Sequence, residues 1–387
     1  MIKLYFKKTY ILILSVIFAT LSGINITLAD KLPKNIAWTA YGTTSSGYAQ
    51  SVGIGQMLKK NHGVDLRIIP GKNDVSRMVP LKAGQAEICA CGIASYFAQE
   101  GVFMFAGKKW GPMKLYNIFN NIGRNGQMLA TAADANIKTM ADLKGKRVTW
   151  VKGSPALNGN TAGFLAFGGL TWKDVIKVET SGWGASANAV LNGQADATMG
   201  STVGSIYNKL NASPRGLFFP PMPHNDNEAW KRAANTSPHF SKAKITNFIG
   251  STASNKVIEG NNYPYPIFVT LGKTSESLTY ELTKAVMNNY EQFKDSGPGM
   301  DGYQLSNQNL NWIFPYHSGA VKLYKEKGVW TDKHDSHNNS LLKRQDVLAD
   351  AWKSTLKSSA SGDAFKAEWL KNRASALKKA GMPIPFN

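Results

Sequence analysis

LKAGQAE, at residues 81–87, occurs again in altered form as LNGQAD at residues 191–196. At an offset of 109 residues, the loop that carries Ser45 falls on a second loop that carries Ser154. Such internal repetition predicts two similar lobes. Each copy has the pattern of strand, small-residue loop, helix, strand, second loop, helix and strand. We therefore expect each lobe to be an α/β sheet with both loops at one edge.

The predicted fold is an α/β protein of two lobes joined by hinge strands, with a ligand cleft between the two loop-bearing edges. Ligands of open α/β sheets bind beyond the carboxyl ends of the strands, where both sets of loops are expected. The first lobe begins with residues 30–128, and the second spans residues 129–264. Residues 265–387 return to the first lobe and add C-terminal helices. Without residues 1–29 the chain has 387 − 29 = 358 residues, which also exceeds what one core usually supports.

The return to the first lobe is expected as a strand over residues 265–271, followed by helices near residues 276–293 and 346–379. The preceding segment, residues 220–262, is rich in Pro, Asn and Ser and is expected to be irregular.

The N-terminus has the pattern of a secretory signal peptide over residues 1–29. Basic residues at the start precede a short apolar run over residues 11–19, and Thr27-Leu28-Ala29 offers a small-residue cleavage site. The exported chain would then begin at Asp30 and lie in the periplasm. An uncleaved membrane anchor over residues 11–28 is the alternative.

The chain is strongly basic, with a formal net charge of +20. Residues 1–29 hold three lysines and no acidic residue, so their removal leaves +17. A positive electrostatic field favours anionic partners. The alternative is that the basic residues only keep the protein soluble. The lysines are spread along the chain, and a secretory signal argues against a nucleic-acid partner.

The two cysteines, Cys89 and Cys91, are expected on one strand, where their side chains point to the same face. A bridge between residues so close would be strained, so they are predicted to be small core residues.

The first loop of each lobe enters a helix, whose unpaired N–H groups attract anions. Hydroxyl residues Thr43, Thr44 and Ser45 lie in one loop and Ser154 in the other. They could bind a carboxylate, or they could simply cap the helices. Their recurrence at one offset favours a shared ligand site.

The second loops differ between the lobes. Arg77 could clamp a carboxylate, Asp74 could accept from an ammonium or hydroxyl group, and Trp183 could lie flat on an organic ligand. The alternatives are a helix-end salt bridge for the first two and interlobe packing for Trp183. The candidate ligand-binding residues are Tyr41, Thr43, Thr44, Ser45, Tyr48, Asn73, Asp74, Arg77, Ser95, Ser154, Pro155, Ala156, Asn158, Trp183 and Ser201.

Motifs of catalysis and cofactor binding are weak. The sequence contains no Gly-x-Ser-x-Gly elbow, phosphate-binding loop or His-Glu-x-x-His pair. His334 and His337 lie in a polar stretch that is expected to be a surface loop, and His317 is expected to be a hydrogen-bonded packing residue. We therefore expect no catalytic residue, no metal and no cofactor.

Four blocks together carry a family resemblance: residues 81–87, MADLKGKRV at 140–148, GQADA at 193–197, and HSGA at 317–320 followed by Tyr324 and Gly328. In this order they resemble the TAXI (TRAP-associated extracytoplasmic immunogenic) solute-binding proteins. These are the periplasmic receptors of one branch of the tripartite ATP-independent periplasmic (TRAP) transporters. The resemblance covers nearly the whole exported chain.

The resemblance implies a two-lobed periplasmic-binding-protein fold of type II character that closes on a small organic acid or amino acid. Such a receptor delivers its ligand to TRAP membrane permease subunits, and we expect it to act as a monomer. The chain departs from the family pattern at Asn73-Asp74, at Arg77 and at Pro155-Ala156, so the ligand cannot be copied from relatives.

Two other classes of function fit the sequence. An enzyme on the same fold would place a carboxylate pair or a histidine in the cleft and turn over its ligand. A basic protein that binds surfaces or polyanions would lose binding steeply with salt.

Overall fold

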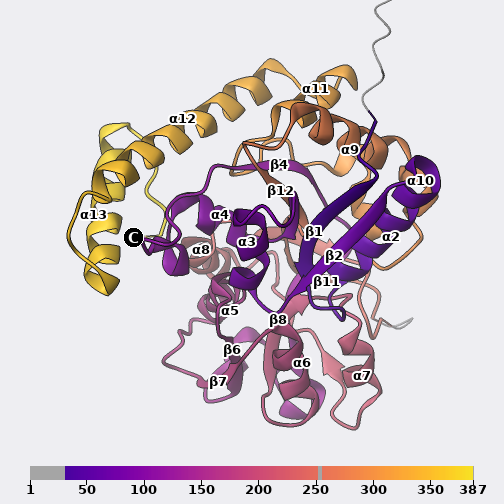
Figure 1. Cartoon of the computed structure of the whole chain (residues 1–387). Coiled ribbons are helices and arrows are strands. Elements are labelled where there is room, and N and C mark those ends of the chain that lie inside the picture. Colours follow the sequence, from indigo (N-terminus) through magenta and orange to yellow (C-terminus); the bar gives the residue numbers. More distant parts are fainter. Residues whose placement is uncertain (1–30, 252–254, 387) are drawn as a thin grey trace, which may run out of the picture. The chain divides into compact units, whose positions relative to one another are not determined.

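The computed structural model describes residues 31–251 and 255–386, so the predicted signal peptide lies outside the described residues. Residues 33–387 form one compact unit (Figure 1). Within the described ranges, no helix has the length and apolar character needed to cross a membrane.

The first lobe contains a five-stranded sheet in the order β2-β1-β3-β12-β4. β1 lies between β2 and β3 and is parallel to both, whereas β12 is antiparallel to β3 and β4. The strands are β1 (Asn35–Tyr41), β2 (Asp65–Gly71), β3 (Ile88–Cys91), β4 (Leu115–Asn120) and β12 (Ile267–Leu271).

The second lobe repeats this arrangement in the order β7-β6-β8-β5-β9. β6 is parallel to β7 and β8, and β5 is antiparallel to β8. The strands are β5 (Gln127–Ala132), β6 (Arg147–Val151), β7 (Ile176–Thr180), β8 (Ala197–Ser201) and β9 (Leu217–Phe218). The two lobes that the repeat predicts are therefore present, and the predicted fold class is confirmed.

The repeated segments form the same turn in both lobes. Each copy leaves a helix, passes through a glycine and enters the third strand of its sheet. Gly84 and Gly193 occupy these turns with φ of 73° and 76°. This left-handed conformation favours glycine, which explains why the two copies share that residue.

Helices flank both sheets (Figure 1). Before the chain passes to the second lobe, the first lobe contains the helices α2 (Ser46–His62), α3 (Asp74–Lys82) and α4 (Ala94–Glu100). The second lobe contains α5 (Pro155–Phe167), α6 (Trp183–Leu191), α7 (Ile206–Ala212) and α8 (Asn227–Thr236). After the return follow α9 (Glu276–Asn288), α10 (Tyr290–Phe293), α11 (Ser318–Glu326), α12 (Asp332–Thr355) and α13 (Gly362–Lys379).

Two segments carry the chain between the sheets: residues 121–126 between β4 and β5, and residues 263–266 before β12. They lie side by side, because the N–H of Tyr265 donates to the carbonyl of Asn121 at 2.8 Å. The predicted lobe boundaries, at residues 128/129 and 264/265, remain predictions.

Each lobe has its own apolar core against its sheet. In the first lobe, Trp38 of β1 meets Phe268 of β12 edge to face, with ring centroids 5.1 Å apart. A further apolar cluster joins α12 and α13, the orange and yellow helices of Figure 1, around the fully buried Trp369. The C-terminal helices thus add a packed layer to the first lobe.

Two expectations about secondary structure need correction, and a third concerns the cysteines. Segment 220–262 is not wholly irregular, because it contains α8 and the antiparallel pair β10 (Ser241–Ile245) and β11 (Ile258–Asn262). His334 and His337 lie in α12 and not in a surface loop.

Cys89 and Cys91 are fully buried core residues of β3, as expected, but they are joined by a disulfide. Their Cα atoms are 5.1 Å apart, within the range that a disulfide spans, so the spacing argument against a bridge was wrong.

Candidate ligand-binding site between the lobes

Four helices begin at the edges where the lobes face each other. Ser45 precedes α2, and its hydroxyl accepts from the N–H of Tyr48 at 3.2 Å. Asn73 precedes α3 and forms a capping box with Ser76. These are the local signals that start helices after strands, and they set α2 and α3 at the cleft. α5 and α6 begin at the matching positions of the second lobe.

The two edges touch through direct hydrogen bonds. The amide of Asn73 donates to the carbonyl of Lys152 at 3.0 Å. The N–H of Trp183 donates to the carbonyl of Lys72 at 3.1 Å. Gly182 allows this approach, because a Cβ there would lie 2.6 Å from the same carbonyl oxygen. The structure is therefore a closed arrangement of the lobes.

Asp74 of the first lobe binds the helix start of the second. Its Oδ2 accepts from the N–H of Ala156, in the first turn of α5, at 2.9 Å. Its Oδ1 accepts from Nη2 of Arg77 at 2.7 Å and from the hydroxyl of Tyr41. That hydroxyl also lies 3.0 Å from Oγ of Ser154. The α5 anion position that we predicted for a ligand carboxylate is thus occupied by a carboxylate of the chain itself.

Arg77 is held in place by more than its ion pair. Its Nη1 donates to the carbonyl of Ala90 at 3.0 Å, and its guanidinium carbon lies 3.5 Å from the centre of the Tyr41 ring. Burial lowers the pKa of Arg77, but Tyr41 and Asp74 outweigh this effect and raise it above its ordinary value. Burial, with Asp74 adding to it, also raises the pKa of Tyr41 well above its usual range. At neutral pH both groups keep their protons.

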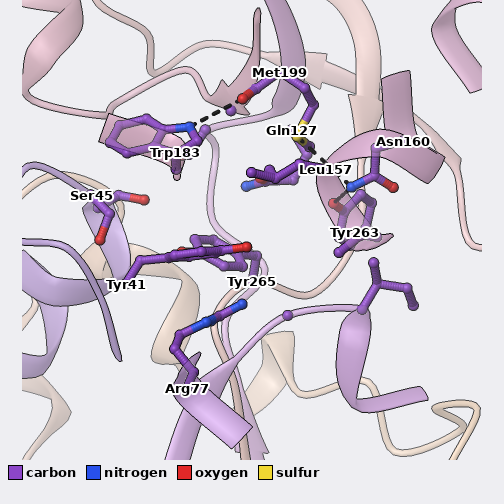
Figure 2. Close-up of a pocket in the computed structure, with 16 residues that line it drawn as sticks. Tyr41, Ser45, Arg77, Gln127, Leu157, Asn160, Trp183, Met199, Tyr263 and Tyr265 are labelled. Carbon is purple, nitrogen blue, oxygen red and sulfur yellow. Dashed lines mark hydrogen bonds between the residues drawn. The ribbon is translucent and has the colours of Figure 1, made fainter. Parts of the chain in front are cut away.

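A pocket lies between the lobes beside Arg77 (Figure 2). The pocket has a volume of about 420 Å³, which includes space open to solvent. The lining residues are Tyr41, Ser45, Ser46, Arg77, Gly92, Ile93, Gln127, Ala156, Leu157, Asn160, Trp183, Met199, Gly200, Ser201, Tyr263 and Tyr265.

Several polar atoms of the wall lack a partner among the described residues. These are Nε of Arg77, Oγ of Ser46 and Nε2 of Gln127. All three side chains are at least 97% buried. A buried polar group without a hydrogen bond costs free energy, so these atoms are suited to receive a polar ligand.

A chain of hydrogen bonds orients the hydroxyl of Tyr263. Nε2 of His239 lies 2.6 Å from Oδ1 of Asn160, and Nδ2 of Asn160 donates to the Tyr263 hydroxyl at 2.6 Å. Burial lowers the pKa of His239 to about 3, so the ring is neutral and carries its proton on Nε2. Since the Tyr263 hydroxyl accepts from Asn160, its own proton remains free to donate into the pocket.

Trp183 forms the opposite wall from Arg77, as Figure 2 shows. Its indole nitrogen donates to the carbonyl of Met199 at 3.1 Å, and its ring meets Tyr207 edge to face. The side chain is 5% exposed. Trp183 packs within its own lobe and lines the pocket, and its predicted contact with an organic ligand stays a prediction.

The predicted site residues divide into two groups. Those on the pocket wall are Tyr41, Ser45, Arg77, Ala156, Trp183 and Ser201. Those off the wall are Thr43, Thr44, Tyr48, Asn73, Asp74, Ser95, Ser154, Pro155 and Asn158.

Most residues off the wall hold the loops in shape. Asn158 pairs with both backbone polar groups of Val151, and the hydroxyl of Ser95 donates to the carbonyl of Gly92 at 2.6 Å. The carbonyl of Thr44 accepts from the N–H of Ser205 across the lobes at 3.1 Å. Arg77 and Asp74 form the salt bridge that was the alternative to direct ligand contact.

Several residues of the wall were not predicted from the sequence, among them Gln127, Asn160, Tyr263 and Tyr265. Gln127 begins β5, Tyr263 and Tyr265 lie in the return segment, and Asn160 lies one turn into α5. A weak signal was present, because aromatic residues alternate with proline in the segment YPYP at residues 263–266. A segment that joins two lobes necessarily passes the floor of the cleft between them.

The fold and the pocket define a two-lobed α/β protein with a pocket at the lobe interface. The chain belongs to the NMT1-like family, whose model matches residues 39–328. The helices α12 and α13 lie beyond the matched region.

Solved structures with a similar arrangement include an alkanesulfonate-binding protein from Xanthomonas axonopodis pv. citri bound to MOPS. It is 15% identical over 84% of this chain and 93% of its own, with a TM-score of 0.42. Another is an ancestral arginine-binding protein bound to arginine, 15% identical over 70% of this chain and 96% of its own, with a TM-score of 0.41. Neither likeness identifies a ligand for this chain.

Proposed function

We propose that the protein is an extracytoplasmic solute receptor. It binds a small organic anion or zwitterion of the carboxylate or amino acid type between its lobes, without transforming it. The observation that carries this proposal is the pocket at the lobe interface, whose lining residues include Arg77. The Nε atom of this arginine is buried and has no partner among the described residues.

Hinge closure is the mechanism that we propose. The lobes are joined by two segments, 121–126 and 263–266, which can bend without unfolding either sheet. Closure brings Asp74 to the start of α5 and Trp183 to Lys72. A ligand that enters the open cleft exchanges its water shell for the polar atoms of the wall and is enclosed.

The partner of the loaded receptor is proposed to be a set of TRAP membrane permease subunits. The support for this step is the resemblance of four sequence blocks to TAXI solute-binding proteins, among them residues 81–87 and 193–197. Periplasmic location follows from the same proposal together with the signal pattern of residues 1–29.

A thermal-shift screen of the purified protein against small carboxylic acids, amino acids and sulfonates tests the proposal. At a ligand concentration of 100 times Kd, binding stabilises the folded protein by about 2.7 kcal/mol, which raises Tm measurably. A saturable shift with one chemical class supports a receptor. Absence of any shift, or chemical conversion of the bound compound, contradicts it.

A further inference from the structure

We infer that the solute is an anion that lacks an ammonium group, such as a 2-oxo or 2-hydroxy carboxylic acid, and that amino acids are discriminated against. This inference rests on the proposed function and sharpens it. It follows from the charges and the free hydrogen-bonding atoms of the pocket wall.

The wall carries a positive group and no negative one. Arg77 is the charged residue among the 16 lining residues, and none of them is Asp or Glu. The nearby carboxylate of Asp74 is off the wall and already accepts from Tyr41, Arg77 and Ala156. Arg77 and Asp74 neutralise each other, but both oxygens of that carboxylate already accept hydrogen bonds. An ammonium group in the pocket would therefore lie near a guanidinium without a carboxylate partner on the wall.

The polar atoms of the wall that lack a hydrogen-bond partner favour a ligand with acceptor oxygens. Nε of Arg77 can only donate, and the oriented hydroxyl of Tyr263 has a proton to give. Ser46 adds a hydroxyl without a partner. A carboxylate with a neighbouring oxo or hydroxyl oxygen can accept from these groups at once, and hydrogen bonds to charged groups are the stronger kind.

Two of the aromatic residues on the wall, Tyr41 and Trp183, do not supply a substitute site for the ammonium group. The face of Tyr41 is covered by the guanidinium of Arg77 at 3.5 Å, so a second cation there would be repelled. Trp183 uses its indole nitrogen on Met199 and lies against Gly200 and Gly204, where added Cβ atoms would come within 2.8 and 2.9 Å of its ring system.

Matched pairs of ligands test the inference by isothermal titration calorimetry on the full-length protein. The pairs are pyruvate with L-alanine, 2-oxoglutarate with L-glutamate, and phenylpyruvate with L-phenylalanine. We expect an oxo acid of at least one pair to bind about tenfold or more tighter than its amino acid. Equal or tighter binding of the amino acid in the pair that binds overturns the inference but leaves the receptor function intact. Failure of all six compounds to bind, when the thermal-shift screen finds an amino acid that does bind, also overturns the inference and leaves the receptor function intact.

A variant that adds a negative charge to the wall gives a second test. Gln127→Glu keeps the side-chain shape and adds the missing carboxylate, so the affinity ratio of oxo acid to amino acid is expected to fall by about tenfold or more. Gln85→Glu makes the same change at an exposed position of the repeat and is expected to leave the ratio unchanged. An unchanged ratio in Gln127→Glu, with binding retained, contradicts the inference. If that variant does not fold, the matched pairs on the unmodified protein still decide.

Discussion

The carboxylate of Asp74 accepts a hydrogen bond at 2.9 Å from the N–H of Ala156, which lies in the first turn of a helix of the opposite lobe. The helix start carries partial positive charge, so this contact joins the lobes electrostatically as well as by a hydrogen bond. The closed lobes are therefore stabilised from within the chain, and the ligand need not supply a carboxylate at this position.

Asp74→Asn is expected to destabilise the protein strongly. The change keeps the size of the side chain but leaves the charge of Arg77 buried without its partner, which costs about 3–5 kcal/mol in other proteins. Urea unfolding measures the loss. Asp65→Asn, in the exposed pair with Lys59, is the matched control and should cost less than about 1 kcal/mol. Equal losses in the two variants would show that the Asp74 pair contributes no more than a surface pair.

Asp74→Asn should also favour the open lobes. Loss of the charge weakens the contact with the start of α5, so the radius of gyration in solution is expected to rise relative to the unmodified protein. Small-angle X-ray scattering without ligand measures this. An unchanged radius in a folded variant means that other interlobe contacts, such as that between Trp183 and Lys72, suffice for closure.

Arg77→Lys is expected to weaken ligand binding by about 1.5–3 kcal/mol, or about 10- to 150-fold. Lysine keeps the positive charge beside Asp74 but has no Nε–H at the pocket wall and no planar fork. This makes it a better probe than Arg77→Ala, which would leave Asp74 unpaired. Arg67→Lys, at an exposed position of β2, should bind as the unmodified protein does. An unaltered dissociation constant in Arg77→Lys removes Nε from the site.

Trp183→Phe is expected to abolish most of the change in tryptophan fluorescence on ligand binding. The indole forms one wall of the pocket, so closure around a ligand alters its surroundings. Trp172→Phe, which removes a tryptophan packed on Trp150 away from the pocket, should retain the change. Loss of the signal in the control together with retention in Trp183→Phe would place the ligand elsewhere.

His239 should make stability depend on pH. The unfolded chain takes up a proton near pH 6.5, whereas the folded ring, with its pKa lowered by burial to about 3, does not. Its contribution is therefore fully present above pH 6.5 and declines as the pH falls, by about 2 kcal/mol between pH 7 and pH 5.

Replacement of His239 by Gln should reduce this pH dependence by the same amount, as measured by urea unfolding at both pH values. His62→Gln removes an exposed histidine and is the control. If the two variants retain the same slope, the buried ring is not neutral in the folded protein.

The architecture could be predicted because it is repeated. The turns at Gly84 and Gly193 mark equivalent places in two sheets, and equivalent sheets have equivalent edges. The helix starts at Ser45 and Asn73 are also local features that sequence patterns describe well. These two kinds of signal place the cleft without any knowledge of long-range contacts.

The details of the pocket could not be predicted in the same way. Arg77 donates to Asp74, whose carboxylate also accepts from Ala156 of the other lobe. No local sequence pattern encodes how closely Ala156 lies to Asp74. The chain from His239 through Asn160 to Tyr263 joins residues up to 103 positions apart. Such contacts follow from tertiary packing, which overrides local patterns.

The central claim is that a solute is bound between the lobes by the wall that carries Arg77. A crystal structure of the protein with the tightest-binding acid of the screen tests it most directly. We predict ligand density between Arg77 and Trp183, with a ligand oxygen within hydrogen-bonding distance of Nε of Arg77 and of the Tyr263 hydroxyl. Ligand density at another place, with this pocket filled by water, would contradict the claim.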